Sequence, residues 1–228
     1  MPESRIVDLS HPIRAGLVTY PGLPAPTITP HLTRADSRAT YAPGTEFAMD
    51  IITMIGNTGT YLDSPFHRYA DGADLAGLDL ASLVGLRAEV FHLDDAWTPE
   101  HRGIRPDMLA DRDVRGAAVL LHTGWDRLFG TPEYGAGAPF LTGDAAQLLI
   151  DAGAALVGID SLNIDDTHPS TGGARPAHTL LLGAGVHVVE HLTRLGDLPE
   201  QGARFTAAPP AVEGFGTFPV RAFAELPG

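Results

Sequence analysis

The amino-acid sequence predicts an α/β fold in a single domain covering residues 1–228. Short apolar runs bounded by turn residues alternate with amphipathic segments, as buried strands alternate with helices in this class. The chain has 228 residues, 44% of them hydrophobic, which is enough for one large core. Its 26 glycines and 19 prolines are spread along the chain and indicate many turns rather than a low-complexity segment.

Eight apolar runs are predicted to be strands because turn residues bound each of them. They cover residues 5–10, 27–33, 47–55, 88–93, 117–123, 155–161, 186–192 and 218–224. The runs at 117–123 and 155–161 are almost entirely apolar, which is typical of strands that are covered on both faces of a sheet.

Two helices are predicted between these strands. Thr142 can cap the first, and apolar residues recur with helical spacing at 145, 148, 149 and 152 before Gly153. The second, residues 176–185, begins with Pro176 in its first turn and ends on glycines. Residues 1–40, rich in proline and turns, are predicted to form an arm or layer over the sheet, at a subunit interface.

The composition excludes several classes of partner. A formal net charge of −13 with only 15 basic residues argues against nucleic acid and against anionic membranes. The absence of cysteine excludes disulfides and thiolate chemistry. The N-terminus has no apolar signal core, and no window approaches the roughly 18 apolar residues that a membrane span requires, so we expect a cytoplasmic protein.

Polar residues gather where three predicted strands end. These clusters run from Asn57 to His67, from His122 to Asp126 and from Asp160 to Asp165, and Glu190 lies in or at the end of a fourth strand. Because ligands collect at the carboxyl ends of strands in open α/β sheets, we expect these segments to form one site.

The segment GNTGTYLDSPFHRYADG, residues 56–72, holds the strongest candidates. Pro65 bars a regular helix between Asp63 and His67, so the segment is predicted to be an extended loop. Asp63 could ligate a metal, and His67 could ligate it or transfer protons. The alternative is that Asp63 caps local amides and His67 is a structural histidine.

This segment resembles the signature of the putative cyclase superfamily, which includes bacterial kynurenine formamidases and isatin hydrolases. That signature reads H-x-G-T-H-x-D-x-P-x-H, and here it reads N-T-G-T-Y-L-D-S-P-F-H, so Asn57 and Tyr61 replace two histidines. The resemblance continues through DLSHPI, TYPG, LLHTGW, GIDSLNID, AHTLLL and VVEHL, and so covers nearly the whole chain.

The resemblance implies a swivelling β/β/α fold, a homodimer or homotetramer, and a zinc or manganese site that activates water against an amide, formamide or lactam carbonyl of a small substrate. Carried over by position, it assigns Asp63, His178 and Glu190 as metal ligands and His67 as the proton-transfer residue. An amide and a phenol bind such metals poorly, so Asn57 and Tyr61 leave room for a single ion at most.

Two other functions remain open. Without a metal, Asp63 and Glu190 would form an acid–base pair, and Tyr61 and His67 would serve a cyclase or dehydratase. A third possibility is a non-catalytic homologue that binds a ligand.

The pocket wall is assigned to Asn57, Phe66, Tyr69 and Trp125, with core packing as the alternative for the aromatic residues. Arg175 could clamp a substrate carboxylate, or could be a solvated loop arginine. His191 follows Glu190 in a predicted strand, where neighbours face opposite sides, so we expect it to point outward.

Overall fold

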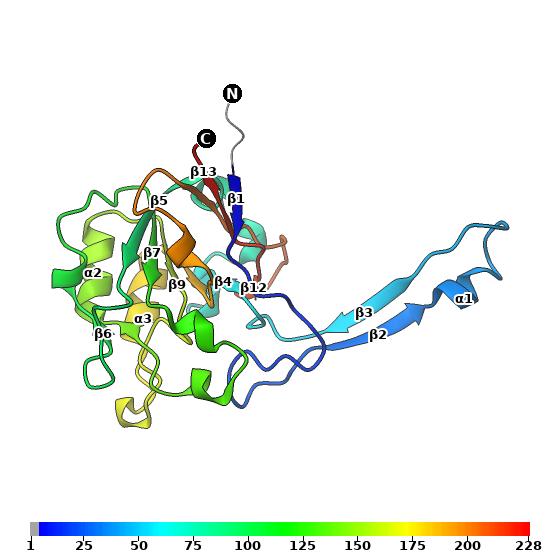
Figure 1. Cartoon of the computed structure of the whole chain (residues 1–228), viewed down its shortest axis with the longest axis horizontal. Helices are drawn as coiled ribbons and strands as arrows, with labels where there is room; N and C mark the ends of the chain where they lie inside the picture. The colour runs from blue at the N-terminus through cyan, green and yellow to red at the C-terminus, as the bar shows by residue number, and fades with distance from the viewer. Residues whose placement is uncertain (1–4) are drawn as a thin grey trace.

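The computed structural model describes residues 5–228. A curled sheet of nine strands runs in the order β1-β13-β11-β5-β7-β9-β10-β4-β12 (Figure 1). The four strands β5, β7, β9 and β10 are parallel to their neighbours within that group, and the outer strands pair antiparallel. The bounds of the nine strands are Arg5–Asp8 (β1), Tyr61–Asp63 (β4), Leu86–His92 (β5), Ala118–His122 (β7), Leu156–Ile159 (β9), His187–Glu190 (β10), Arg204–Thr206 (β11), Thr217–Pro219 (β12) and Phe223–Leu226 (β13).

Two helices pack on one face of the sheet. Helix α2 is Gly143–Asp151, and the Thr142 hydroxyl accepts from the Ala145 N–H, as the sequence predicts. Helix α3 is Pro176–Gly183, with Pro176 in its first turn. Both contribute leucines and alanines to one apolar cluster, and a second cluster fills the opposite side of the sheet. No helix in residues 5–228 is long and apolar enough to cross a membrane.

A separate ribbon extends away from this body (Figure 1). Strands β2 (Thr27–Leu32) and β3 (Met49–Thr53) pair only with each other, and the short helix α1 (Arg34–Ser37) follows β2 toward the tip. Both runs are strands as predicted, but neither is buried: every residue of β3 is exposed. The ribbon overlaps the predicted arm of residues 1–40 only in part, since β1 belongs to the main sheet.

Two further short strands, β6 (Gly103–Ile104) and β8 (Phe140–Leu141), pair beside the main sheet. The prediction of an extended loop is wrong for residues 61–67. Residues Tyr61–Asp63 form strand β4, which pairs antiparallel with β10 and β12, and Pro65–His67 is a 3₁₀ turn. The partners of β4 come from segments more than 120 residues later, which local sequence patterns do not reveal.

Candidate functional site

Strand β4 carries the central side chains of the site. The turn before it is fixed by Gly59, whose φ of +65° suits glycine and whose N–H donates to the Thr19 hydroxyl at 2.7 Å. Because side chains alternate along a strand, Tyr61 and Asp63 share one face while Leu62 enters the apolar core on the other. The short strand therefore presents a phenol and a carboxylate to the same side.

His178 lies in the first turn of α3 and is held there by Asp165. The Asp165 carboxylate accepts from the backbone N–H groups of Ala177 (2.6 Å) and His178 (3.0 Å) and pairs with His178 Nδ1 at 2.7 Å. This contact places a proton on Nδ1 and directs Nε2 toward Asp63 and Glu190. Metal-bound histidines commonly have such a carboxylate partner on the second ring nitrogen.

Glu190 ends strand β10 and is 1% exposed. Its Oε2 accepts from the Tyr61 hydroxyl at 2.6 Å, and its Oε1 accepts from the Ile164 N–H at 2.6 Å. The Asn163 amide also reaches Oε2, at 3.5 Å. These donors hold the carboxylate in one orientation beside His178.

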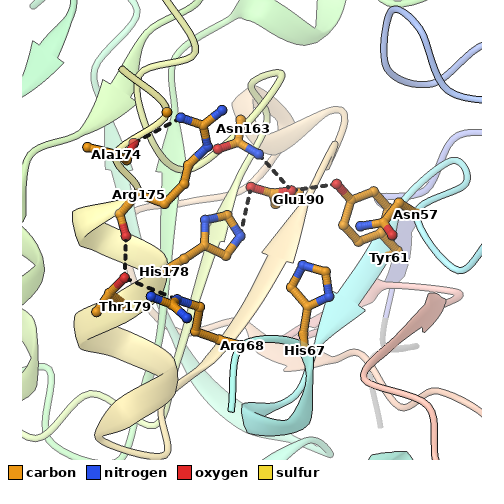
Figure 2. A pocket seen from close by; sticks show the side chains of 11 residues that line it. Asn57, Tyr61, His67, Arg68, Asn163, Ala174, Arg175, His178, Thr179 and Glu190 are labelled. Atoms are coloured by element: carbon orange, nitrogen blue, oxygen red, sulfur yellow. Dashed lines mark hydrogen bonds and ion pairs between the residues drawn. The ribbon is translucent and has the colours of Figure 1, made fainter. Parts of the chain in front are cut away.

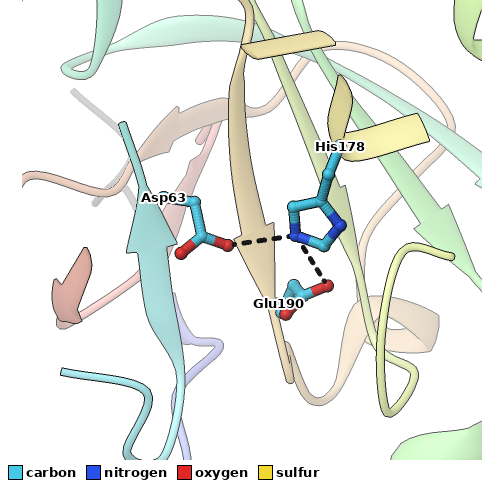
Figure 3. Close-up of side chains that lie close together, drawn as sticks. All are labelled: Asp63, His178 and Glu190. Atoms are coloured by element: carbon cyan, nitrogen blue, oxygen red, sulfur yellow. Dashed lines mark ion pairs between the residues drawn. The ribbon is translucent and has the colours of Figure 1, made fainter. Parts of the chain in front are cut away.

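Asp63, His178 and Glu190 converge from three elements (Figure 3). His178 Nε2 lies 3.4 Å from Asp63 Oδ2 and 3.6 Å from Glu190 Oε1, and one ligand atom of each residue lies within 4.8 Å of the others. Both oxygens of Asp63 are buried and have no hydrogen-bond partner in residues 5–228. A buried carboxylate needs a cation or a proton, so this donor set fits one divalent ion.

The electrostatics of the site also favour a cation. Burial raises the pKa of Glu190 to about 7, with Asp63 adding to the effect and the His178 charge opposing it. Burial alone would lower the pKa of His178, but Glu190, Asp165 and Asp63 outweigh it and raise that pKa to about 10. Burial, Glu190 and Asp63 raise the pKa of Tyr61 well above 10, so the phenol stays protonated.

A cavity of about 380 Å³ opens over these groups (Figure 2). His67 stands at its edge with 35% of its side chain exposed, and its Nε2 lies 3.9 Å from Asp63 Oδ1. The lining comes from four distant segments, and the predicted cluster from His122 to Asp126 is not one of them. It consists of Asn57, Tyr61, His67, Arg68, Asn163, Gly173, Ala174, Arg175, His178, Thr179 and Glu190.

Three residues assigned to the pocket wall lie elsewhere. Phe66 and Tyr69 do not line the cavity, and the Tyr69 hydroxyl donates to the Thr179 carbonyl at 2.8 Å. Trp125 packs against Tyr134 and Leu162 and donates to the Tyr134 carbonyl at 3.1 Å. Asn57 and Arg175 do line the cavity.

Two expectations about neighbouring polar groups are wrong. His191 is fully buried rather than pointing outward, because its φ of +55° ends the strand alternation, and its Nδ1 contacts the Tyr134 hydroxyl at 2.8 Å. The cluster from His122 to Asp126 does not join the cavity. Asp160 instead binds that segment, accepting from Thr123 and Gly124.

Sequence reasoning missed four residues of the site: Arg68, Asn163, Asp165 and Thr179. Asn163 and Asp165 lie within the polar cluster after the strand at 155, so the cluster itself was a signal. Which of its side chains would reach α3 and Glu190 depends on the docking of that helix, which the local sequence does not show.

Comparisons with known proteins agree with this geometry. The family model described as Putative cyclase matches residues 7–166, well over half of the chain. A kynurenine formamidase from Geobacillus thermodenitrificans is 36% identical over 143 residues, 62% of this chain and 63% of that protein, so that match spans less than two thirds of either. Another, from Paracidovorax citrulli, is 28% identical over 225 residues and covers 96% of both chains.

A solved structure shows the same fold. An isatin hydrolase, crystallised with the product analogue thioisatinate, superposes with a TM-score of 0.80 at 23% identity, covering 99% of this chain and 94% of that one. This likeness confirms the predicted swivelling β/β/α fold. From the family match and the relatives that span its full length, we conclude that the chain belongs to the Putative cyclase family.

Proposed function

We propose that this protein is a hydrolase that cleaves the C–N bond of a small amide or formamide, or of a lactam. The observation that carries the proposal is the buried carboxylate of Asp63, which has no hydrogen-bond partner in residues 5–228 and lies beside His178 and Glu190, two residues that line the cavity together with His67. The relatives that cover the whole chain are named kynurenine formamidases, which supports a formamide as the substrate.

Asp63, His178 and Glu190 would hold one divalent ion, zinc or manganese. Such an ion supplies polarisation of the substrate carbonyl and a lowered pKa for its bound water. Asp165 keeps the proton of His178 on Nδ1, and Tyr61 and Ile164 fix the Glu190 carboxylate. These contacts keep the three donor atoms oriented toward one point.

His67 is the proton carrier in this proposal. Two imidazoles, His67 and His178, border both the buried Asp63 carboxylate and the cavity, and His67 is the more exposed of the two. It would accept the proton of the attacking water and then donate it to the nitrogen of the leaving amine. Its partial exposure allows the side chain to reach both positions.

The metal-free cyclase or dehydratase requires the Tyr61 hydroxyl to donate to the substrate. In the structure that proton is given to Glu190 at 2.6 Å. Tyr61 therefore acts as a holder of the carboxylate, and the hydrolase is the better supported proposal.

The test begins with metal analysis of protein purified without chelator, which should contain about one zinc or manganese ion per chain. Asp63→Asn should lose the ion and the hydrolysis of formanilide, while Asp107→Asn, which alters an exposed aspartate, should keep both. Full activity in metal-free protein would reject the metal requirement. A metal-loaded protein that cleaves no aryl formamide would reject the hydrolase function.

We also propose a homodimer or homotetramer in which the β2–β3 ribbon contacts a second copy of the chain. The ribbon carries Ile28, Met49, Ile51 and Ile52, each at least 44% exposed. An isolated two-stranded hairpin is at best marginally stable in water, so a partner surface is expected to cover it.

A further inference from the structure

Two arginines line the cavity, and neither has an acidic partner among residues 5–228. Arg68 follows the 3₁₀ turn that carries His67, and Arg175 immediately precedes α3. Within residues 5–228 no carboxylate lies within 4.0 Å of either guanidinium, although seven other arginines of this acidic chain form such ion pairs. Their charges are therefore available to a ligand.

Both arginines are oriented by neutral groups. Arg68 Nε donates to the Thr179 hydroxyl at 3.4 Å, and that hydroxyl donates to the Arg175 carbonyl at 2.7 Å (Figure 2). Arg175 Nη1 donates to the carbonyls of Asp166 (3.2 Å) and Ala174 (2.9 Å). Thr179 thus links the Arg68 side chain to the backbone of Arg175, and both Thr179 and Arg175 lie within four residues of His178 at the start of α3.

Much of each guanidinium is left free to donate. A guanidinium carries five N–H donors, and among the described residues Nη1 and Nη2 of Arg68, and Nε and Nη2 of Arg175, make no hydrogen bond. Paired N–H groups of this kind match the two oxygens of a carboxylate. Two arginines that are held in place and keep free N–H donors can bind an anionic group of a ligand.

The charge in the cavity is divided. Glu190 and His178 line it in front of the buried Asp63, and the two arginines line it as well. The arginines would attract an anionic group of a substrate, so that its amide could extend toward His178 and Glu190. A cavity of about 380 Å³ limits the substrate to a small molecule.

We infer that Arg68 and Arg175 form an anion subsite, and that the substrates are small amides or formamides bearing a carboxylate apart from the scissile bond. This inference rests on the proposed hydrolase function. Arg68, Arg175 and Thr179 thereby determine specificity and orientation, whereas His67 and the Asp63–His178–Glu190 group perform the reaction.

Substrates matched in all but charge test the subsite. Formanilide is neutral, and the three ring isomers of formamidobenzoate add a carboxylate at different distances from the same bond. The wild type should cleave at least one isomer with a kcat/KM tenfold or more above that of formanilide. Arg68→Gln and Arg175→Gln should each raise KM for that isomer about tenfold, and the preference for that isomer over formanilide, measured as the ratio of kcat/KM, should fall toward one.

Arg204→Gln is the matched control, because Arg204 is exposed on β11 and also lacks a carboxylate partner within 4.0 Å among residues 5–228. Calorimetric binding of the corresponding aminobenzoate separates the two proposals. If no formamide is cleaved but this anion binds tenfold more weakly to both pocket variants, the hydrolase fails and the subsite stands. Equal cleavage of neutral and anionic formamides by wild type and variants overturns the subsite.

Discussion

Tyr61 shows how one substitution changes the chemistry of a site. The family signature has histidine at this position, and the tyrosine here donates its proton to Glu190 rather than offering a lone pair to a metal. Asn57, at the other replaced position, lines the cavity together with the tyrosine. Tyr61 thus supports the Glu190 carboxylate beside the Asp63–His178–Glu190 group that is proposed to hold a cation.

Tyr61→Phe tests this supporting role. The change preserves the ring and removes the donor from a buried carboxylate, so we expect a loss of about 1.5–3 kcal/mol in the free energy of unfolding. Urea denaturation of chelator-treated protein at pH 8 measures it. Tyr69→Phe is the control, because Tyr69 donates to a neutral carbonyl. This change should lower the free energy of unfolding by only about 0.5–1.5 kcal/mol. An unchanged midpoint in the Tyr61 variant would contradict the role.

At the residue scale, the sequence predicts some residues of the site correctly and others not. Asp63, His178 and Glu190 could be grouped through their positions in the resemblance, and the structure places them together. The aromatic residues near the motif could not be separated from core residues, because Phe66, Tyr69 and Trp125 have similar local surroundings in the sequence. His191 was misplaced because the alternation rule requires extended backbone, which its positive φ interrupts.

At the scale of elements, β4 and β12 hold the segment around His67 by close backbone contact. Ser64 donates to the Gly216 carbonyl at 2.8 Å, and Thr217 lies opposite Asp63 in the pairing. A Cβ on Gly216 would lie 2.4 Å from His67 N and 2.5 Å from its Cα. Glycine is therefore required at 216 by the approach of the turn that presents His67.

Gly216→Ala should displace His67. Because the clash is with backbone atoms, the turn must shift, at an expected cost of about 1–3 kcal/mol in stability. We expect kcat for an aryl formamide to fall at least tenfold while the metal content stays near one ion per chain. Gly77→Ala is the control, since its added Cβ would meet only the Asp74 side chain at 3.4 Å. Wild-type kcat in the Gly216 variant would refute the argument.

The elements differ in how well the sequence predicts them. Helix α2 carries its cap, its apolar face and its terminal glycine within residues 142–153, so its local signals agree with the fold. Strand β4 has three residues, and its partners lie far away in the chain. Its position depends on tertiary pairing, and the proline two residues after it suggested a loop.

At the scale of the whole molecule, apolar strands occur in two places: buried in the main sheet and exposed in the ribbon. The runs at 117–123 and 155–161 become central strands covered on both faces. The runs at 27–33 and 47–55 have comparable local patterns but form the projecting ribbon. Apolar content alone predicts that a strand will be covered, and it does not tell whether the cover comes from the same chain.

The proposed assembly can be tested on the ribbon itself. In the pairing register Ile28 lies opposite Ile52, and Thr29 lies opposite Ile51, so Ile51 and Ile52 point to opposite faces. Burial of one isoleucine side chain contributes about 1.5–3 kcal/mol, so an aspartate at a covered position should break the contact. Ile51→Asp and Ile52→Asp therefore identify which face the partner covers.

Light scattering after size exclusion should give wild-type protein a mass two or four times its 24.0 kDa, and at least one ribbon variant should fall to the single-chain mass. Leu80→Asp changes a side chain that is 62% exposed on the body of the molecule and should leave the assembly intact. Since the ribbon projects away from the cavity, dissociation should leave metal content near one ion per chain. A wild type that stays at 24.0 kDa at every concentration would exclude the assembly.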